Sequence, residues 1–158
     1  MNGGCQRGTT GYDTIDARNL TISSVLVGGA GSDYLYGGSG QNLLIGGLGA
    51  DHLYAGSAGD ILIGGTTSYD SNPTALAYIM AEWDRTDVSY TTRVKQLNGS
   101  QSGGLNASYF LKSTTVFDDK TTDVLTGGAG MDWFFAHTKG KNQDQVIGLT
   151  SGEVVTSI

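Results

Sequence analysis

The chain has 158 residues, of which 26 are glycine and one is proline, and its formal net charge is −6 at pH 7. This length fits one domain with a modest core, whereas the negative charge argues against a nucleic-acid-binding protein, in which a basic stripe is expected. No apolar run reaches the roughly 18–20 residues that cross a bilayer, and we expect no N-terminal signal peptide, because residues 1–5 contain neither a basic nor an apolar segment.

The acidic residues are mostly aspartates. All 15 except Glu82 and Glu153 are aspartate, which favours turns over helix surfaces. Short carboxylates in glycine-rich turns provide the oxygen ligands that Ca²⁺ prefers. Cys5 is the only cysteine, so the chain has no intrachain disulfide.

The first half of the chain repeats with a period of nine residues. The blocks 28–36, 37–45, 46–54 and 55–63 follow one another without gaps, and a further block lies at 127–135. Each resembles the pattern G-G-x-G-x-D-x-U-x, in which U is a large apolar residue. Weaker copies lie at 8–16, 19–27, 118–126 and 139–147. A sustained period of this kind predicts a repeat architecture.

These blocks resemble the repeats-in-toxin (RTX) family of secreted bacterial calcium-binding proteins, over about residues 8–63 and 118–147. The resemblance implies a right-handed parallel β-roll, a β-solenoid with calcium in its turns. We therefore expect an all-β fold with a small α insertion and a single domain over 1–158. Its parts are a first repeat block at 8–63, a helical insertion with a return strand at 64–117, a second repeat block at 118–147 and a tail at 148–158.

Each nonapeptide divides into a six-residue turn and a three-residue strand. Side chains alternate along a strand, so the central residues Leu35, Leu44, Leu53, Leu62, Leu125 and Phe134 should form a thin inner core. Two nonapeptides then make one coil of 18 residues. The outward neighbours include Tyr36, Tyr54, Trp133 and Phe135, which predicts one aromatic face that suits carbohydrate or another small molecule.

Stacking by whole coils should bring the turn carboxylates into two ladders. One holds Asp33 and Asp51, with Asp123 and Asp13 as further members, and the other holds Asn42, Asp60 and Asp132. The expected backbone ligands are the carbonyls of Gly28, Ala30, Gly37, Ser39, Gly46, Leu48, Gly127 and Ala129. We predict about two to four Ca²⁺ ions, with weaker binding at the neutral Asn42 and a doubtful site at 118–123, which lacks glycine. The alternative is that aspartate and glycine only form turns here.

The insertion at 64–117 has helical rather than strand periodicity. Asn72 is a suitable N-cap and Pro73 a suitable first helical residue, and an apolar face follows at Leu76, Ile79, Met80 and Trp83. A second helix is predicted over about 87–97 and a strand over 109–117. We interpret this helical hairpin as a cap or lateral brace of the roll.

Two other functions are compatible with the sequence. A small hydrolase of glycosidase or esterase type would place its site between the insert and the aromatic face. Its candidate catalytic residues are Glu82, Asp84, Asp87, His52 and His137. A carbohydrate-binding or adhesion module would use the aromatic face alone.

We expect a calcium-binding module rather than an enzyme. The RTX resemblance further implies a secreted or cell-surface location, type I-like export, and membership of a larger secreted protein. Because close carboxylates repel one another, the repeats should fold only when calcium binds outside the cell.

Overall fold

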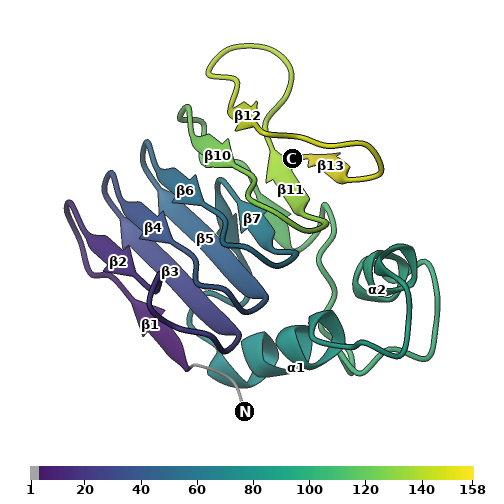
Figure 1. Cartoon of the computed structure of the whole chain (residues 1–158). Helices are drawn as coiled ribbons and strands as arrows, with labels where there is room; N and C mark the ends of the chain where they lie inside the picture. Colours follow the sequence, from purple (N-terminus) through teal and green to yellow (C-terminus); the bar gives the residue numbers. More distant parts are fainter. Residues whose placement is uncertain (1–3) are drawn as a thin grey trace.

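The computed structural model describes residues 4–158 and consists mainly of two parallel β-sheets, with two short helices (Figure 1). Sheet A has the strand order β1 (Cys5–Arg7), β3 (Ser24–Ala30), β5 (Asn42–Leu48), β7 (Ile61–Ile63), β11 (Trp133–Ala136) and β13 (Val154–Ser157). Sheet B has the order β12 (Gln145–Ile147), β10 (Val124–Thr126), β6 (His52–Tyr54), β4 (Tyr34–Tyr36) and β2 (Thr14–Asp16). All pairs within both sheets are parallel, which confirms the predicted class. Across the described residues, neither sheet closes on itself.

The strand register follows the repeat. Leu44 pairs with Leu26 on one side and Leu62 on the other, so strands β3, β5 and β7 of sheet A follow one another at 18 residues in the chain. The register continues across the insertion, where Leu62 pairs with Phe134. In sheet B, Leu53 pairs in the same way with Leu125. The predicted coil length is therefore confirmed between these strands.

The inner core lies between the two sheets. It contains the central apolar residue of each strand, as predicted: Leu26, Leu35, Leu44, Leu53, Leu62, Leu125 and Phe134 are all buried. These side chains come from both sheets and remove the facing surfaces from water, which is the main favourable term in folding.

A second core covers the outer face of sheet A. The outward residues of its strands, such as Ile45, Ile63 and Phe135, are fully buried beneath the helices. The expectation that outward positions form one exposed aromatic face is therefore wrong for this sheet. The sequence does indicate that both faces of sheet A are buried. Every position is apolar in four of its strand segments, 25–27, 43–45, 61–63 and 133–135, a pattern typical of parallel strands buried on both faces.

The covering layer is the predicted helical insertion, which lies beside the sheets in Figure 1. Helix α1 (Pro73–Trp83) begins as expected, with the Asn72 side chain accepting a hydrogen bond from the Ala75 N–H at 3.1 Å. Its predicted apolar face is buried against sheet A. Helix α2 (Tyr90–Leu97) begins three residues later than predicted, because Ser89 is its N-cap. The hairpin is thus a lateral brace. Neither helix within residues 4–158 has the length and apolarity that crossing a membrane requires.

The insertion leaves and rejoins the sheets through a short neck. Strand β8 (Thr66–Thr67) pairs antiparallel with β9 (Val116–Phe117). The strand predicted over 109–117 is therefore wrong except for its last two residues. The hydroxyl of Thr115 instead donates to the Phe110 and Lys112 carbonyls, which bends the chain into a turn before β9.

The segment at 148–158, predicted as a tail, contains a strand of sheet A. Strand β13 pairs with β11, with Phe134 opposite Val155. Glu153 accepts the Asp132 N–H at 3.1 Å and so occupies the position that an aspartate holds in earlier coils. This last repeat does not match the nonapeptide pattern, because it has glutamate where the pattern has aspartate.

Burial of the outer face of sheet A gives a stability prediction. Ile63→Ala should destabilise the calcium-loaded protein by about 2–5 kcal/mol, because it removes a fully buried side chain and leaves a cavity beneath the insert. Thr126→Ala changes the same nonapeptide position on the partly exposed outer face of sheet B, and should cost about 0.5 kcal/mol or less. Urea unfolding followed by circular dichroism measures both values. An equal decrease in stability for the two variants would contradict the burial of this face of sheet A.

Candidate metal centre

The turns that connect the two sheets lie along two opposite edges. Because all strands within a sheet are parallel, the turns that leave sheet A share one edge and those that leave sheet B share the other. The first, called here the Asp33 edge, carries Asp13, Asp33, Asp51, Asp123 and Asp144. The second, the Asn42 edge, carries Asn42, Asp60, Asp132 and Glu153.

On the Asp33 edge, four carboxylates each accept, through one oxygen, a backbone hydrogen bond from the preceding coil. Oδ1 of Asp33 accepts the Asp13 N–H and Oδ1 of Asp51 accepts the Asp33 N–H, both at 2.8 Å. Oδ1 of Asp123 accepts the Asp51 N–H at 2.8 Å, and Oδ1 of Asp144 accepts the Asp123 N–H at 2.9 Å. One ladder therefore joins the predicted ligands Asp33, Asp51 and Asp123, and it extends to Asp144.

The second oxygen differs along this ladder. Asp33 and Asp51 are fully buried, and the Oδ2 atom of each accepts no hydrogen bond from residues 4–158. A buried carboxylate oxygen without a partner costs considerable free energy. A cation at this point would remove that cost.

Glycines shape the space around these two oxygens. A Cβ placed on Gly46 would lie 2.5 Å from Asp51 Oδ2 and 2.8 Å from the Gly64 carbonyl oxygen. A Cβ on Gly28 would lie 2.6 Å from Asp33 Oδ2 and against the Gly46 carbonyl oxygen. Carboxylate and carbonyl oxygens of successive coils thus converge where only glycine fits. This donor set is the one that Ca²⁺ prefers.

The predicted backbone ligands lie in the corresponding turns. On the Asp33 edge, the carbonyls of Ala30 and Leu48 accept the N–H groups of Gly11 and Gly31 at 2.6 and 2.7 Å. The carbonyls of Gly37, Ser39, Gly127 and Ala129 belong to turns of the Asn42 edge. Within residues 4–158, no three His, Cys, Asp or Glu side chains form a metal cluster. A cation here would therefore depend on backbone oxygens for much of its coordination.

The insertion divides one turn of the Asp33 edge. Gly64 and Gly65 supply its first part, and Gly65 accepts the Gly47 N–H at 3.1 Å. The rest follows the insertion and ends at Asp123. Residues 118–123 contain no glycine, as expected, but Gly64 and Gly65 at the start of the predicted insertion supply the glycines of this turn. Gly64 and Gly65 follow Ile63 at the nonapeptide period, which is the signal that would have identified them.

Asp119 completes the divided turn and was missed from the sequence. The N–H groups of Gly11 and Gly31 each donate to a backbone carbonyl of the next coil, whereas the Gly49 N–H donates to Asp119 Oδ2 at 2.6 Å. The carboxylate therefore replaces a carbonyl that the insertion displaces. Thr121 fixes its other oxygen, through N–H and hydroxyl contacts of 3.1 and 2.9 Å.

Burial perturbs the carboxyl groups of both edges. Removal from water, with a smaller contribution from neighbouring carboxylates, raises the pKa of Asp51 to about 7 and that of Asp123 to about 8. On the Asn42 edge, burial raises the pKa of Asp60 to about 8 and that of Asp132 to about 6. Without a cation, the ionised forms of these carboxyl groups are therefore less favourable than in water, most of all for Asp60 and Asp123.

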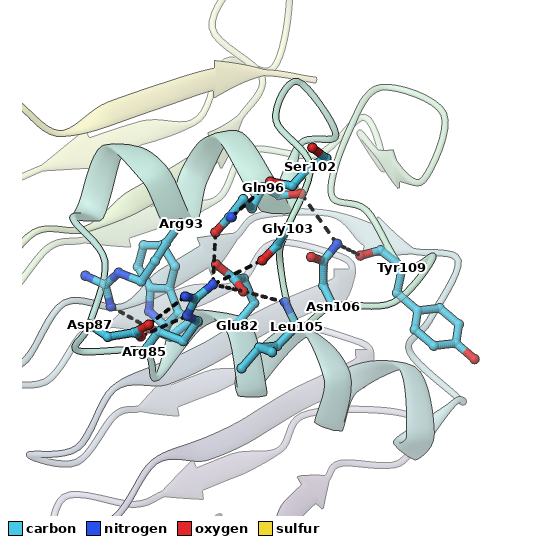
Figure 2. Close-up of polar contacts among 11 residues, drawn as sticks. Glu82, Arg85, Asp87, Arg93, Gln96, Ser102, Gly103, Leu105, Asn106 and Tyr109 are labelled. Atoms are coloured by element: carbon cyan, nitrogen blue, oxygen red, sulfur yellow. Dashed lines mark hydrogen bonds and ion pairs between the residues drawn. The ribbon is translucent and has the colours of Figure 1, made fainter.

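Glu82, the first candidate catalytic residue, is an internal structural group (Figure 2). It is fully buried, and its Oε2 accepts the Leu105 N–H at 2.6 Å and an Arg85 contact at 3.3 Å. Arg85 also contacts Gln96 at 3.3 Å and the Gly103 carbonyl at 3.4 Å. The cluster fastens the loop after α2 to both helices.

Of the remaining catalytic candidates, Asp87 shares Arg85 with Glu82, whereas the two histidines lie elsewhere. Asp87 forms an exposed ion pair with Arg85, and burial raises the pKa of Asp84. His52 lies on the outer face of sheet B, stacked on Tyr34 at 4.6 Å, and His137 contacts the Ile158 carbonyl at the C-terminal end at 3.1 Å. The two sheets separate the helices from His52.

The described residues do not form the predicted groove between the helices and the sheet. The outer face of sheet A is filled by side chains of the insert. A small depression of about 140 Å³ lies at its margin, lined by Gly4, Cys5, Val25, Pro73, Leu76 and Ala77. It contains none of the candidate acids or histidines, so the geometry gives the hydrolase hypothesis no support.

The candidate aromatic ligand-binding residues are divided between two sheets. Trp133 and Phe135 are buried beneath the insert and are closed to a ligand. Tyr36 and Tyr54 lie on the outer face of sheet B, stacked at 4.9 Å with an interplanar angle of 5°. Their facing surfaces are already covered by each other, and Arg18 lies over the Tyr36 ring at 4.6 Å. Sugar stacking requires free ring faces, so this arrangement suits sheet stabilisation better.

A family comparison agrees with the geometry of the turns. Residues 24–53 and 36–66 match the RTX calcium-binding nonapeptide repeat, in four copies. Residues 24–66 are RTX repeats. They include Asp33, Asp51, Asn42 and Asp60, and they end at the divided turn. No curated protein and no solved structure matches the chain.

The raised pKa values predict how pH affects the calcium-free RTX repeats. The folded-state pKa values of Asp51 and Asp123, about 7 and 8, exceed their ordinary value of 3.8. The folded state therefore binds more protons, and its stability should fall as pH rises from about 4 to 8. Protein stripped of metal on a chelating resin should melt at a higher temperature at pH 5 than at pH 8, with a smaller difference in Asp51→Asn. A melting temperature that rises with pH would contradict this.

The replacement of a carbonyl by Asp119 gives a second prediction. Asp119→Ala should destabilise the protein by about 1–3 kcal/mol, because the Gly49 N–H loses a charged acceptor. The neighbouring Asp118→Ala is the control, since Asp118 accepts only the local Lys120 N–H at 3.0 Å and lies 3.6 Å from His137. Denaturant unfolding at saturating calcium compares the two. A similar decrease in the free energy of unfolding for both variants would contradict this role of Asp119.

Proposed function

We propose that this chain is a calcium-binding RTX module in which Ca²⁺ joins successive turns along the Asp33 edge. The observation that carries the proposal is the pair of fully buried, unpartnered Oδ2 atoms of Asp33 and Asp51. Each lies beside a glycine and the carbonyl of the next coil. The RTX repeats at 24–66 support calcium as the cation.

Two positions on this edge have the residues for an ion. The first lies between the turns at 28–33 and 46–51, with Asp33 and Asp51 and the carbonyls of Gly28, Ala30, Gly46 and Leu48. The second lies between the turn at 46–51 and the divided turn, with Asp123 and the Gly64 carbonyl. Both offer many oxygens from a flexible backbone, which favours Ca²⁺ over Mg²⁺, since Mg²⁺ requires a strict octahedron and retains its waters.

Bound calcium would neutralise carboxylates that otherwise repel one another. Burial already makes their ionised form unfavourable, as the raised pKa values of Asp51 and Asp123 indicate. Calcium binding and ordering of these turns are then one thermodynamic event. We propose that it completes a right-handed β-roll that forms one domain.

The same coupling suits an exported protein. A chain with disordered turns at low cytoplasmic calcium could pass through a narrow channel and fold at the higher calcium concentration outside. We therefore propose a secreted or cell-surface location, reached by type I-like export, as a module of a larger protein. The RTX repeats support this inference by analogy alone.

Removal of one ligand tests the proposal. Asp51→Ala should weaken calcium binding about tenfold or more, because both positions on the Asp33 edge lose a carboxylate. Asp16→Ala is the control, since Asp16 pairs with Arg18 on the outside of the same roll. Calorimetric titration with calcium, repeated with magnesium, measures the change. Wild-type protein that binds no calcium would refute the function.

A further inference from the structure

We infer that Asn42 replaces a calcium ion, so that the turns at 37–42 and 55–60 are joined without metal. This inference rests on the proposed function in one respect, because it assigns calcium to the Asp33 edge and excludes it from this part of the Asn42 edge. The neutral amide then takes the place of the cation between these two turns.

The contacts of the Asn42 amide support this role. Its Nδ2 donates to the Gly40 carbonyl at 2.6 Å, to the Gly38 carbonyl at 3.1 Å and to Asp60 Oδ1 at 3.0 Å. Two carbonyls and a carboxylate are the oxygens that would converge on an ion between these turns. The amide must present nitrogen to them, since its oxygen would face three acceptors.

Both oxygens of the Asp60 carboxylate already have hydrogen-bond donors, unlike those of Asp33 and Asp51. Its Oδ1 accepts both the backbone and side-chain N–H groups of Asn42, and its Oδ2 accepts the Gly56 N–H at 2.6 Å. The equivalent Oδ2 atoms of Asp33 and Asp51 have no partner within the described chain. The unpartnered Oδ1 of Asn42 is a single neutral oxygen, and an ion could use it only after all three Nδ2 contacts had broken.

The helical insertion holds the same edge from outside. The Trp83 indole N–H donates to the Gly59 carbonyl at 2.9 Å. The Tyr90 hydroxyl donates to the Asp132 carbonyl at 2.7 Å and accepts the Val154 N–H at 3.0 Å. Both side chains come from helices packed on sheet A. The contacts of the Asn42 amide and those of the two helices therefore both stabilise the Asn42 edge without metal.

Calcium stoichiometry tests the substitution directly. Asn42→Asp removes the donor and adds a carboxylate, so it should bind one more Ca²⁺ per chain than wild type in a calorimetric titration. Asn19→Asp makes the same charge change at an exposed turn residue of the same roll and should leave the number unchanged. An unchanged number in Asn42→Asp, with calcium still bound by wild type, would overturn the inference. Loss of binding in wild type would instead overturn the proposed function.

Hydrogen exchange of the wild-type protein gives an independent test that needs no variant. The Asn42 N–H donates to Asp60 Oδ1 and the Asp33 N–H donates to Asp51 Oδ1, so the two amides make equivalent bonds on opposite edges. After calcium removal, the Asn42 amide should stay protected about tenfold or more above the Asp33 amide. Equal protection of both amides, or their joint loss, would show that the Asn42 edge depends on calcium too.

Discussion

The structure depends on a hydrogen bond in which a turn aspartate accepts the backbone N–H of the aspartate or asparagine at the same position one coil before it. This contact uses one carboxylate oxygen and buries the group, so the second oxygen must also find a partner. In Asp60 and Asp132 the second oxygen accepts an N–H of its own turn, at 2.6 and 3.1 Å. In Asp33 and Asp51 it has none among the described residues. The need for a cation therefore follows from how each turn bends and not from the aspartate alone.

The two edges consequently stabilise the same sheets by different means. Burial raises the pKa of carboxyl groups on both edges, but of the two edges only the Asp33 edge has, among the described residues, buried carboxylate oxygens without a hydrogen-bond partner, which a divalent ion would supply. On the Asn42 edge, neutral donors and the helices take that role. Sheet A lies between the inner core and the insert, so apolar side chains are buried on both of its faces.

Much of the fold could be predicted from the sequence because the repeat fixes both register and inner core. The 18-residue spacing placed Leu44 between Leu26 and Leu62, and the aspartates into ladders. What the pattern could not give was the environment of each polar group. Glu82 was a candidate catalytic acid, but it is fully buried and its Oε2 accepts the Leu105 N–H, a contact between segments far apart in the chain. The role of Asp119 was hidden for a related reason, since the repeat pattern has glycine at its position and gives no role to a carboxylate there.

The position of the insertion shows how a repeat tolerates interruption. The entropy of closing a loop grows slowly with its length, so the main cost falls on the turn that the insertion divides. That turn is restored from both sides, by Gly64 and Gly65 before the insertion and by Asp119 and Asp123 after it. The neck of β8 and β9 holds these two parts together. Because the register across the gap is kept, the insertion can add a second core on sheet A without disturbing the first.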